Sequence, residues 1–294
     1  MFDLFGKGRI YVPLSSLYES ELRTPPALHE RRLFAGYLRN LAKILDHSPT
    51  GRILFSVAAD RGMTAGLDPL LEPSGSFFYA LQNHFDLGYQ PDILQKSEKG
   101  ISRALVSVIG ALRRGWHHHH GTGPDLQLKP RDFVTQYRVL EADAEALTHL
   151  IAWELRGAGL SFLWRHLLSS ANGDMTIVFE NSVMNNPRCQ FDGTALRSVF
   201  NQWFADHARI SAADHMALEM IDMGLLEPTV ARNIGLRSLS SGQIEKTGIA
   251  PDGSNYLAGC VFSKAWYRGI EDEFNLTHLR HIETDVNQLL ENHK

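Results

Sequence analysis

The sequence has few cysteines and no long apolar run. Cys189 and Cys260 are the only cysteines among 294 residues, and no CxxC pair occurs, so neither a disulfide framework nor a cysteine zinc site is indicated. The N-terminal segment lacks the basic and apolar regions of a secretory signal. The most apolar stretch, ISRALVSVIGAL, is interrupted by Arg103 and is too short to span a bilayer. We therefore expect a soluble, cytoplasmic protein without membrane partners.

Positive charge is not in excess. The 29 Lys and Arg residues face 33 Asp and Glu residues, and this balance argues against a dedicated nucleic-acid surface. No GxSxG, GxGxxG or GxxxxGK[ST] pattern occurs, so α/β-hydrolase, dinucleotide-binding and P-loop functions lack support.

The hydrophobic pattern predicts a mainly α (α+β) fold in a single domain, 1–294, since no repeat or linker divides the chain. Residues 28–46 form a helix with Leu33, Tyr37, Leu41 and Leu45 on one stripe. A small β element near residues 50–90 is expected from three β-rich segments, 52–58, 74–81 and 85–90, the last two as a hairpin or as edge strands.

Helices account for the rest of the chain. Long helices are predicted at 92–118 and at 130–157, the second opened by Pro130. Further helices are expected at 160–169, 173–184, 193–206, 211–223 and 275–291. Residues 50–160 would form the core, and 161–294 a helical C-terminal part.

The helix at 92–118 has two unlike faces. One is apolar and consists of Leu94, Ile101, Leu105, Val108, Leu112 and Trp116. The other is basic with a bare middle, and consists of Arg103, Ser107, Gly110, Arg114, His117 and His118. Glycine costs about 1 kcal/mol relative to alanine inside a helix. We therefore expect another element to pack closely at Gly110, in preference to a solvated face.

Three segments carry a resemblance to a known family: GSFFYALQNHFDLGYQ (75–90), SRALVSVIGALRRGWH (102–117) and YRVLEADAEALTHLIAWELRGAG (137–159). The chain resembles a bacterial family of zincin-like metallopeptidases, and the likeness extends toward the C-terminus through 200–223 and 255–267. The resemblance implies a zincin order, in which a strand pair precedes a helix bearing HExxH and a second helix supplies an acidic third ligand.

The resemblance also locates a departure, because usual members read HELRHAWQ where this chain reads GALRRGWH. HExxH holds zinc with two imidazoles and uses its glutamate as the general base. Those positions are Gly110, Ala111 and Arg114, within Gly110-Ala111-Leu112-Arg113-Arg114, and none can serve the reaction. We expect no zinc cofactor and no zinc-peptidase catalysis.

The helix at 130–157 places Asp143 within an apolar face, where a carboxylate needs a partner. Local capping or pairing is the ordinary explanation. The functional one places Asp143 where the third zinc ligand would lie, with Arg114 supplying the positive charge in place of the metal. Glu141 and Glu145 lie opposite, with Arg138, Thr148 and Arg156, in a mixture typical of a solvated surface.

Four consecutive histidines, His117 to His120, follow Arg114. Consecutive helical residues do not converge, so a polar helix end capped by Gly121 is favoured over a metal site. His215, Glu219 and Asp222 share one side of a helix, but such His–Glu spacing is usually structural. His278 and His281 are expected on an exposed helix.

The sequence leaves two functions open. The first is a pseudopeptidase that binds an unknown protein or peptide, its former site made of Gly110, Arg114, His117, His118, Glu141 and Asp143. The alternative is an active zinc hydrolase whose rebuilt site uses His117, His118 and acids of the 141–145 segment, chiefly Glu141.

Overall fold

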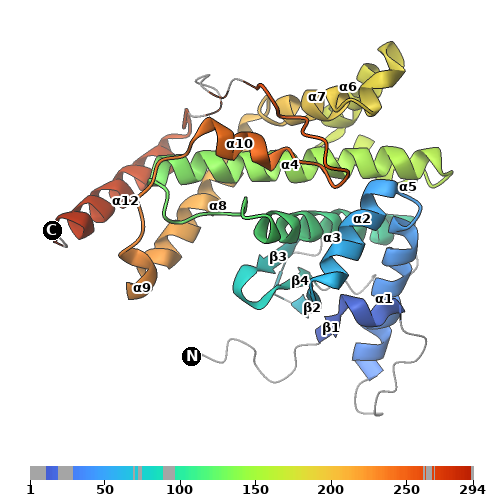
Figure 1. Ribbon diagram of the computed structural model, residues 1–294, viewed down its shortest axis with the longest axis horizontal. Coiled ribbons are helices and arrows are strands. Elements are labelled where there is room, and N and C mark those ends of the chain that lie inside the picture. The colour runs from blue at the N-terminus through green and yellow to red at the C-terminus, as the bar shows by residue number, and fades with distance from the viewer. Residues whose placement is uncertain are drawn as a thin grey trace. The chain divides into compact units, whose positions relative to one another are not determined.

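The computed structural model describes residues 11–18, 29–68, 70–71, 75–88, 97–260, 262, 267 and 269–292. These residues are mainly helical and include one four-stranded sheet, which confirms the predicted fold class (Figure 1). Among them, no helix combines the length and the apolar character needed to cross a membrane.

The chain divides into two compact units, each built from two segments. Unit 1 comprises Met1–Gly121 and Leu147–Ile177, and unit 2 comprises Thr122–Ala146 and Val178–Lys294. The long helix α4 (Pro130–Gly157) contributes its first part to unit 2 and its last part to unit 1. Its predicted bounds are confirmed, as expected from a proline in its first turn.

The sheet of unit 1 is mixed and has the order β1-β2-β4-β3. Strand β1 (Tyr11–Pro13) pairs antiparallel with β2 (Thr64–Asp68), which runs parallel to β4 (His84–Gly88). Strand β3 (Ser76–Tyr79) pairs antiparallel with β4, so the predicted hairpin is confirmed. The connection passes through Ala80–Gln82 and Asn83, which has the left-handed φ of 48°.

The segment 52–58, predicted as β-rich, is helical instead. It lies within α2 (Pro49–Asp60), where Ser48 caps the N-terminus by accepting a hydrogen bond from the Gly51 amide and Pro49 opens the first turn. The Glu154 carboxylate accepts bonds from the Ser48 hydroxyl and, at 2.8 Å, from that of Thr50. These capping signals outweigh the β propensity of the segment.

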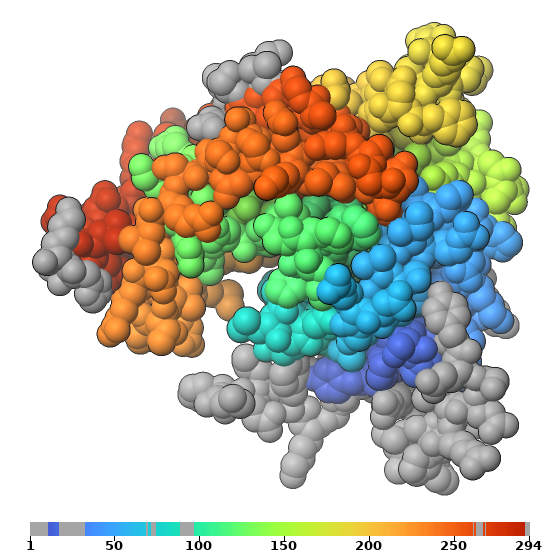
Figure 2. Space-filling view, in the orientation of Figure 1, coloured from blue at the N-terminus to red at the C-terminus, as the bar shows by residue number. Residues whose placement is uncertain are grey.

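Helix α1 (His29–Leu45) forms as predicted, but its buried face includes Phe34, Leu38 and Leu41, whereas the expected stripe residue Leu33 is exposed. Helix α3 (Glu98–His119) begins later than residue 92, because Ser97 caps it and accepts a bond from the Gly100 amide. The predicted Leu94 lies outside the described residues. Helix α3 packs against α2, β3 and β4 (Figure 2).

The five further predicted helices form with shifted ends, and two short helices, α9 and α10, were not predicted. They are α5 (Phe162–Leu168), α6 (Gly173–Asn185), α7 (Thr194–Trp203), α8 (His207–Leu225), α9 (Pro228–Ala231), α10 (Ser241–Thr247) and α12 (Glu273–Asn292), with short 3-10 turns at Leu14–Tyr18 and Pro187–Gln190. In unit 2, α8 packs against α12 (Figure 1). An aromatic cluster beside them includes Phe200, Phe204 and Tyr267, with the rings of Phe204 and Tyr267 4.9 Å apart.

Candidate functional site

The positions that the sequence resemblance assigns to HExxH lie in the middle of α3. Ala111 and Arg113 are fully buried, and Gly110 and Arg114 are half-buried. A Cβ atom added at Gly110 would lie 3.3 Å from the guanidinium of Arg114, in the same helix. A Cβ atom added at Gly115 would instead overlap the side chain of Met63, which precedes β2. The glycine that allows close packing in α3 is therefore Gly115, and the expectation for Gly110 was wrong.

The predicted basic face of α3 is partly buried, since Ser107 and His117 are both buried. A polar helix end would expose these residues to solvent. The sequence predicted one apolar face and one basic face for this helix. Within unit 1, however, α3 packs against both α2 and the sheet, so residues of both faces are buried. The end of the helix does form as predicted, because α3 stops at His119 and Gly121 has a φ of 65°.

The four histidine side chains lie in different surroundings. His117 is buried, whereas the exposed His118 lies with its ring 5.8 Å from that of Phe78. A ring nitrogen of His119 lies 3.1 Å from the side-chain oxygen of Asn83, and the His120 ring stacks on Trp116 at 4.1 Å. Burial, with the neighbouring His118, Arg61 and His120, lowers the pKa of His119. The four rings therefore have different neighbours, and whether any of them binds a metal stays a prediction.

Asp143 on α4 is fully buried, as its apolar surroundings in the sequence predicted. The Tyr256 hydroxyl donates a hydrogen bond of 2.7 Å to its carboxylate. Nothing in the sequence links these two residues, which are separated by more than a hundred positions. Glu141 and Glu145 are half-buried.

The predicted former-site cluster draws on both units. Gly110, Arg114, His117 and His118 belong to unit 1, whereas Glu141 and Asp143 belong to unit 2. Their assembly into one site, and the pairing of Arg114 with Asp143, stay predictions.

Arg138 was expected on a solvated surface, and this expectation was wrong. Its side chain is fully buried and forms a bidentate ion pair with Asp214 of α8. In this pair Nη2 donates to Oδ2 at 2.6 Å, and Nε donates to Oδ1. Nη1 also donates to the carbonyl groups of Tyr267 and Gly269 at 3.1 and 2.9 Å. Arg138 thus links the backbone at Tyr267 and Gly269 to α4 and α8. Thr148, expected on the same solvated surface, is also buried.

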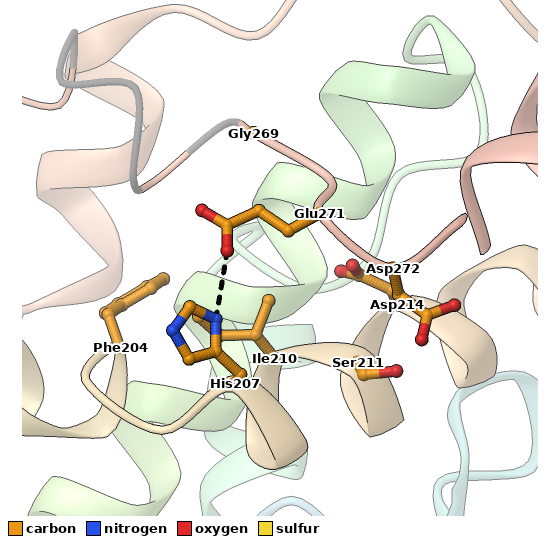
Figure 3. Close-up of a pocket in the computed structure, with 8 residues that line it drawn as sticks. All are labelled: Phe204, His207, Ile210, Ser211, Asp214, Gly269, Glu271 and Asp272. Atoms are coloured by element: carbon orange, nitrogen blue, oxygen red, sulfur yellow. Dashed lines mark ion pairs between the residues drawn. The ribbon is translucent and has the colours of Figure 1, made fainter. Parts of the chain in front are cut away.

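A pocket of about 290 Å³ lies within unit 2 at the start of α8 (Figure 3). Asp206 caps α8 through the Ala208 and Arg209 amides, so His207 occupies the first turn of the helix. Residues before α12 form the facing side, and a His207 ring nitrogen lies 3.0 Å from the Glu271 carboxylate. Asp214, which Arg138 holds in place, lines the same pocket.

Neighbouring groups act in opposite directions on the pKa of Asp214. Burial raises the pKa of its carboxyl, and this effect outweighs the lowering by Arg138, while the nearby Asp272 carboxylate raises the pKa further. The site therefore holds one carboxylate that is paired and buried beside another that repels it.

Unit 1 contains a buried polar group formed by Thr64, His84 and Asp86. The His84 ring lies between the Thr64 hydroxyl, 2.6 Å from Nδ1, and the Asp86 carboxylate, 2.9 Å from Nε2. His84 and Asp86 are buried. Sequence reasoning missed this group, although the paired registers of β2 and β4 place Thr64 opposite His84.

The other histidine candidates pair locally. His215 contacts Glu219 at 3.2 Å on the exposed side of α8, as expected for a structural pair. Asp222 does not join them, because its carboxylate lies 2.7 Å from the ring of His278 in α12. His278 therefore connects α12 to α8 and is only partly exposed, whereas His281 is exposed.

The described metal-ligating residue types meet in pairs, such as His215 with Glu219 and Asp222 with His278. Among the described residues, no three His, Cys, Asp or Glu side chains form a group that could hold a metal ion.

Comparison with known proteins relates the chain to a family. No curated protein and no solved structure matches the chain. A family model described as "Putative metallopeptidase family (DUF6782)" matches residues 93–258, more than half of the chain. The match includes α3, α4 and α8, whereas the strands at 75–90 lie outside it. The chain belongs to the family described as "Putative metallopeptidase family".

Proposed function

We propose that this member of the family no longer performs zinc-dependent peptide hydrolysis and acts by binding a protein or peptide. The observation that carries the proposal is the sequence of α3, where the HExxH positions are occupied by Gly110, Ala111 and Arg114. All three lie inside the segment that the family model matches.

The residues present do not fit a zinc ion. Glycine has no side chain to ligate a metal, and the guanidinium of Arg114 carries a permanent positive charge that repels one. The buried methyl group of Ala111 replaces the carboxylate that would take a proton from water. No catalytic step can be assigned to these positions.

The alternative, a rebuilt site at His117, His118 and Glu141, has less support. His117 and His118 are consecutive on α3, one buried and the other exposed, so their rings face different surroundings. A tetrahedral zinc site needs its imidazoles to converge on one point.

Elemental analysis of tag-free protein, purified without a chelating resin, tests the proposal. We expect zinc well below one equivalent per chain, and no change in zinc content in the His117→Ala variant. About one zinc per chain that is lost in His117→Ala or Glu141→Gln, with the exposed His281→Ala as the matched control, would overturn the proposal in favour of the hydrolase.

A further inference from the structure

We infer that the pocket at the start of α8 binds an organic cation, an ammonium or guanidinium group on an aliphatic stem, such as the side chain of a lysine or arginine in a peptide. The pocket lies wholly within unit 2. This inference goes beyond the proposed loss of peptidase activity and holds whether or not α3 binds zinc.

The pocket joins apolar and acidic walls. Phe204 and Ile210 supply the apolar side, and the acidic side consists of Asp214, Glu271 and Asp272 (Figure 3). Its volume of about 290 Å³ is at the small end of ligand pockets, which span roughly 300–1,000 Å³. It therefore suits one side chain better than a nucleotide or a large cofactor. Long basic side chains pack their stems on apolar surface while their charged ends reach polar groups.

The described residues that line the pocket carry more negative than positive charge. Arg138 pairs with Asp214, and among these described residues the carboxylates of Glu271 and Asp272 are accompanied by the imidazole of His207. A carboxylate offers about four lone-pair positions, and Arg138 uses one on each oxygen of Asp214. Asp214 lines the pocket but is buried, so it acts on a ligand through its charge, and a bound cation would offset the repulsion between Asp214 and Asp272.

The acidic walls are held in position before a ligand arrives. The Asp272 side chain accepts a bond of 2.9 Å from the Asn275 amide at the start of α12. The amide group of Asn275 in turn donates to the Ser211 carbonyl of α8 at 2.9 Å, and Arg138 fixes Gly269. Both sides of the pocket are therefore anchored to each other, which reduces the ordering cost of binding.

A metal ion is a poorer occupant than an organic cation. The described residues contain no group of three His, Cys, Asp or Glu side chains close enough to hold a metal, and this includes the pocket residues. Carboxylates that do not form such a group can still flank a planar guanidinium or an ammonium, whose donors point in several directions.

Binding of small probes to the full-length protein tests the inference. The probes are N-acetyl-arginine methylamide, its lysine counterpart and the neutral isostere N-acetyl-citrulline methylamide, followed by ligand-observed NMR titration. We expect the two cations to bind and the citrulline derivative to bind at least about threefold more weakly. A free diamine, 1,5-diaminopentane, separates the sources: tighter binding of the diamine assigns the pocket to small amines, and tighter binding of the acetylated amides assigns it to peptides.

The double variant Glu271→Gln/Asp272→Asn should weaken cation binding by about threefold to tenfold. Asparagine caps helices as well as aspartate does, so α12 keeps its start. Glu219→Gln, on the exposed side of the same helix α8, is the matched control and should leave binding unchanged. No binding by any cation, equal binding of arginine and citrulline derivatives, or an equal loss in Glu219→Gln would overturn the inference. Zinc content does not enter these results, so failure here is distinguishable from failure of the proposed function.

Discussion

The middle of α3 and the buried face of α4 in unit 2 differ in the chemistry that they retain. The α3 positions that the resemblance assigns to the zinc motif hold a glycine, an alanine and an arginine, whereas α4 buries Arg138 against Asp214 and Asp143 against Tyr256. A buried charge persists only where it is paired, because an unpaired one is expensive. Polar side chains of the described residues therefore converge at the ion pair and pocket of unit 2.

The largest effect is expected at Arg138. The Arg138→Met variant leaves Asp214 buried without its partner and releases the Tyr267 and Gly269 carbonyl groups, so unfolding in urea should show a loss of about 3–5 kcal/mol. Arg237→Met, which breaks the more exposed pair with Asp125, is the control and should cost about 0–1 kcal/mol. A cost for Arg138→Met no larger than that of the control would show that the buried pair does not hold unit 2 together.

A gain of zinc affinity is expected when imidazoles return to α3. Gly110→His/Arg114→His places two imidazoles one helical turn apart at half-buried positions, so zinc should bind about tenfold or more tightly than to the unaltered chain. Gly110→His alone is the control and should gain little. Isothermal titration with zinc gives the answer, and equal affinities of the double variant and the unaltered chain would show that these positions do not face a common ligand point.

These two experiments also separate what the sequence could predict from what it could not. The bounds of α4 follow from Pro130 and Gly157, and the hairpin follows from the β-rich segments that flank Asn83. The helix at 52–58 was missed because its β propensity was weighed before the Ser48–Pro49 capping signal. Propensity is a weak guide where a cap and a buried helical face agree.

The burial of Arg138 could not be predicted, because a helix projection shows which residues share a face but not how many faces the fold covers. The pocket was equally hidden. It joins the start of α8 to residues 269–272, some sixty positions away, and no local spacing encodes that contact. Asp143 was the exception, since a carboxylate on an apolar face predicts a buried partner even when the identity of Tyr256 stays unknown.

The smallest effect concerns Tyr267 beside the pocket. Burial raises the pKa of its phenol to about 12, with Cys260 adding to the rise and Arg197 opposing it. The unfolded phenol ionises near pH 10, so the folded state binds the proton more tightly and loses this stabilisation as the pH rises from about 10 to about 12. Tyr267→Phe should flatten the fall of stability with pH in that window, as read from thermal unfolding.

Tyr267 also donates to Asn201 at 2.9 Å, so Tyr267→Phe will lower stability at neutral pH. The slope with pH, and not the stability itself, is therefore the decisive quantity. An unchanged slope, together with a tyrosinate absorbance titration in which the wild type and the variant differ near pH 10, would contradict a buried phenol.

The most direct test of the proposed loss of peptidase activity is a peptidase assay on tag-free protein with zinc supplied in excess. We predict hydrolysis of casein and of short peptides at the background rate, unchanged by a chelator, because Gly110, Ala111 and Arg114 provide neither metal ligands nor a general base. Hydrolysis that a chelator abolishes and zinc restores would contradict the loss of zinc-peptidase chemistry.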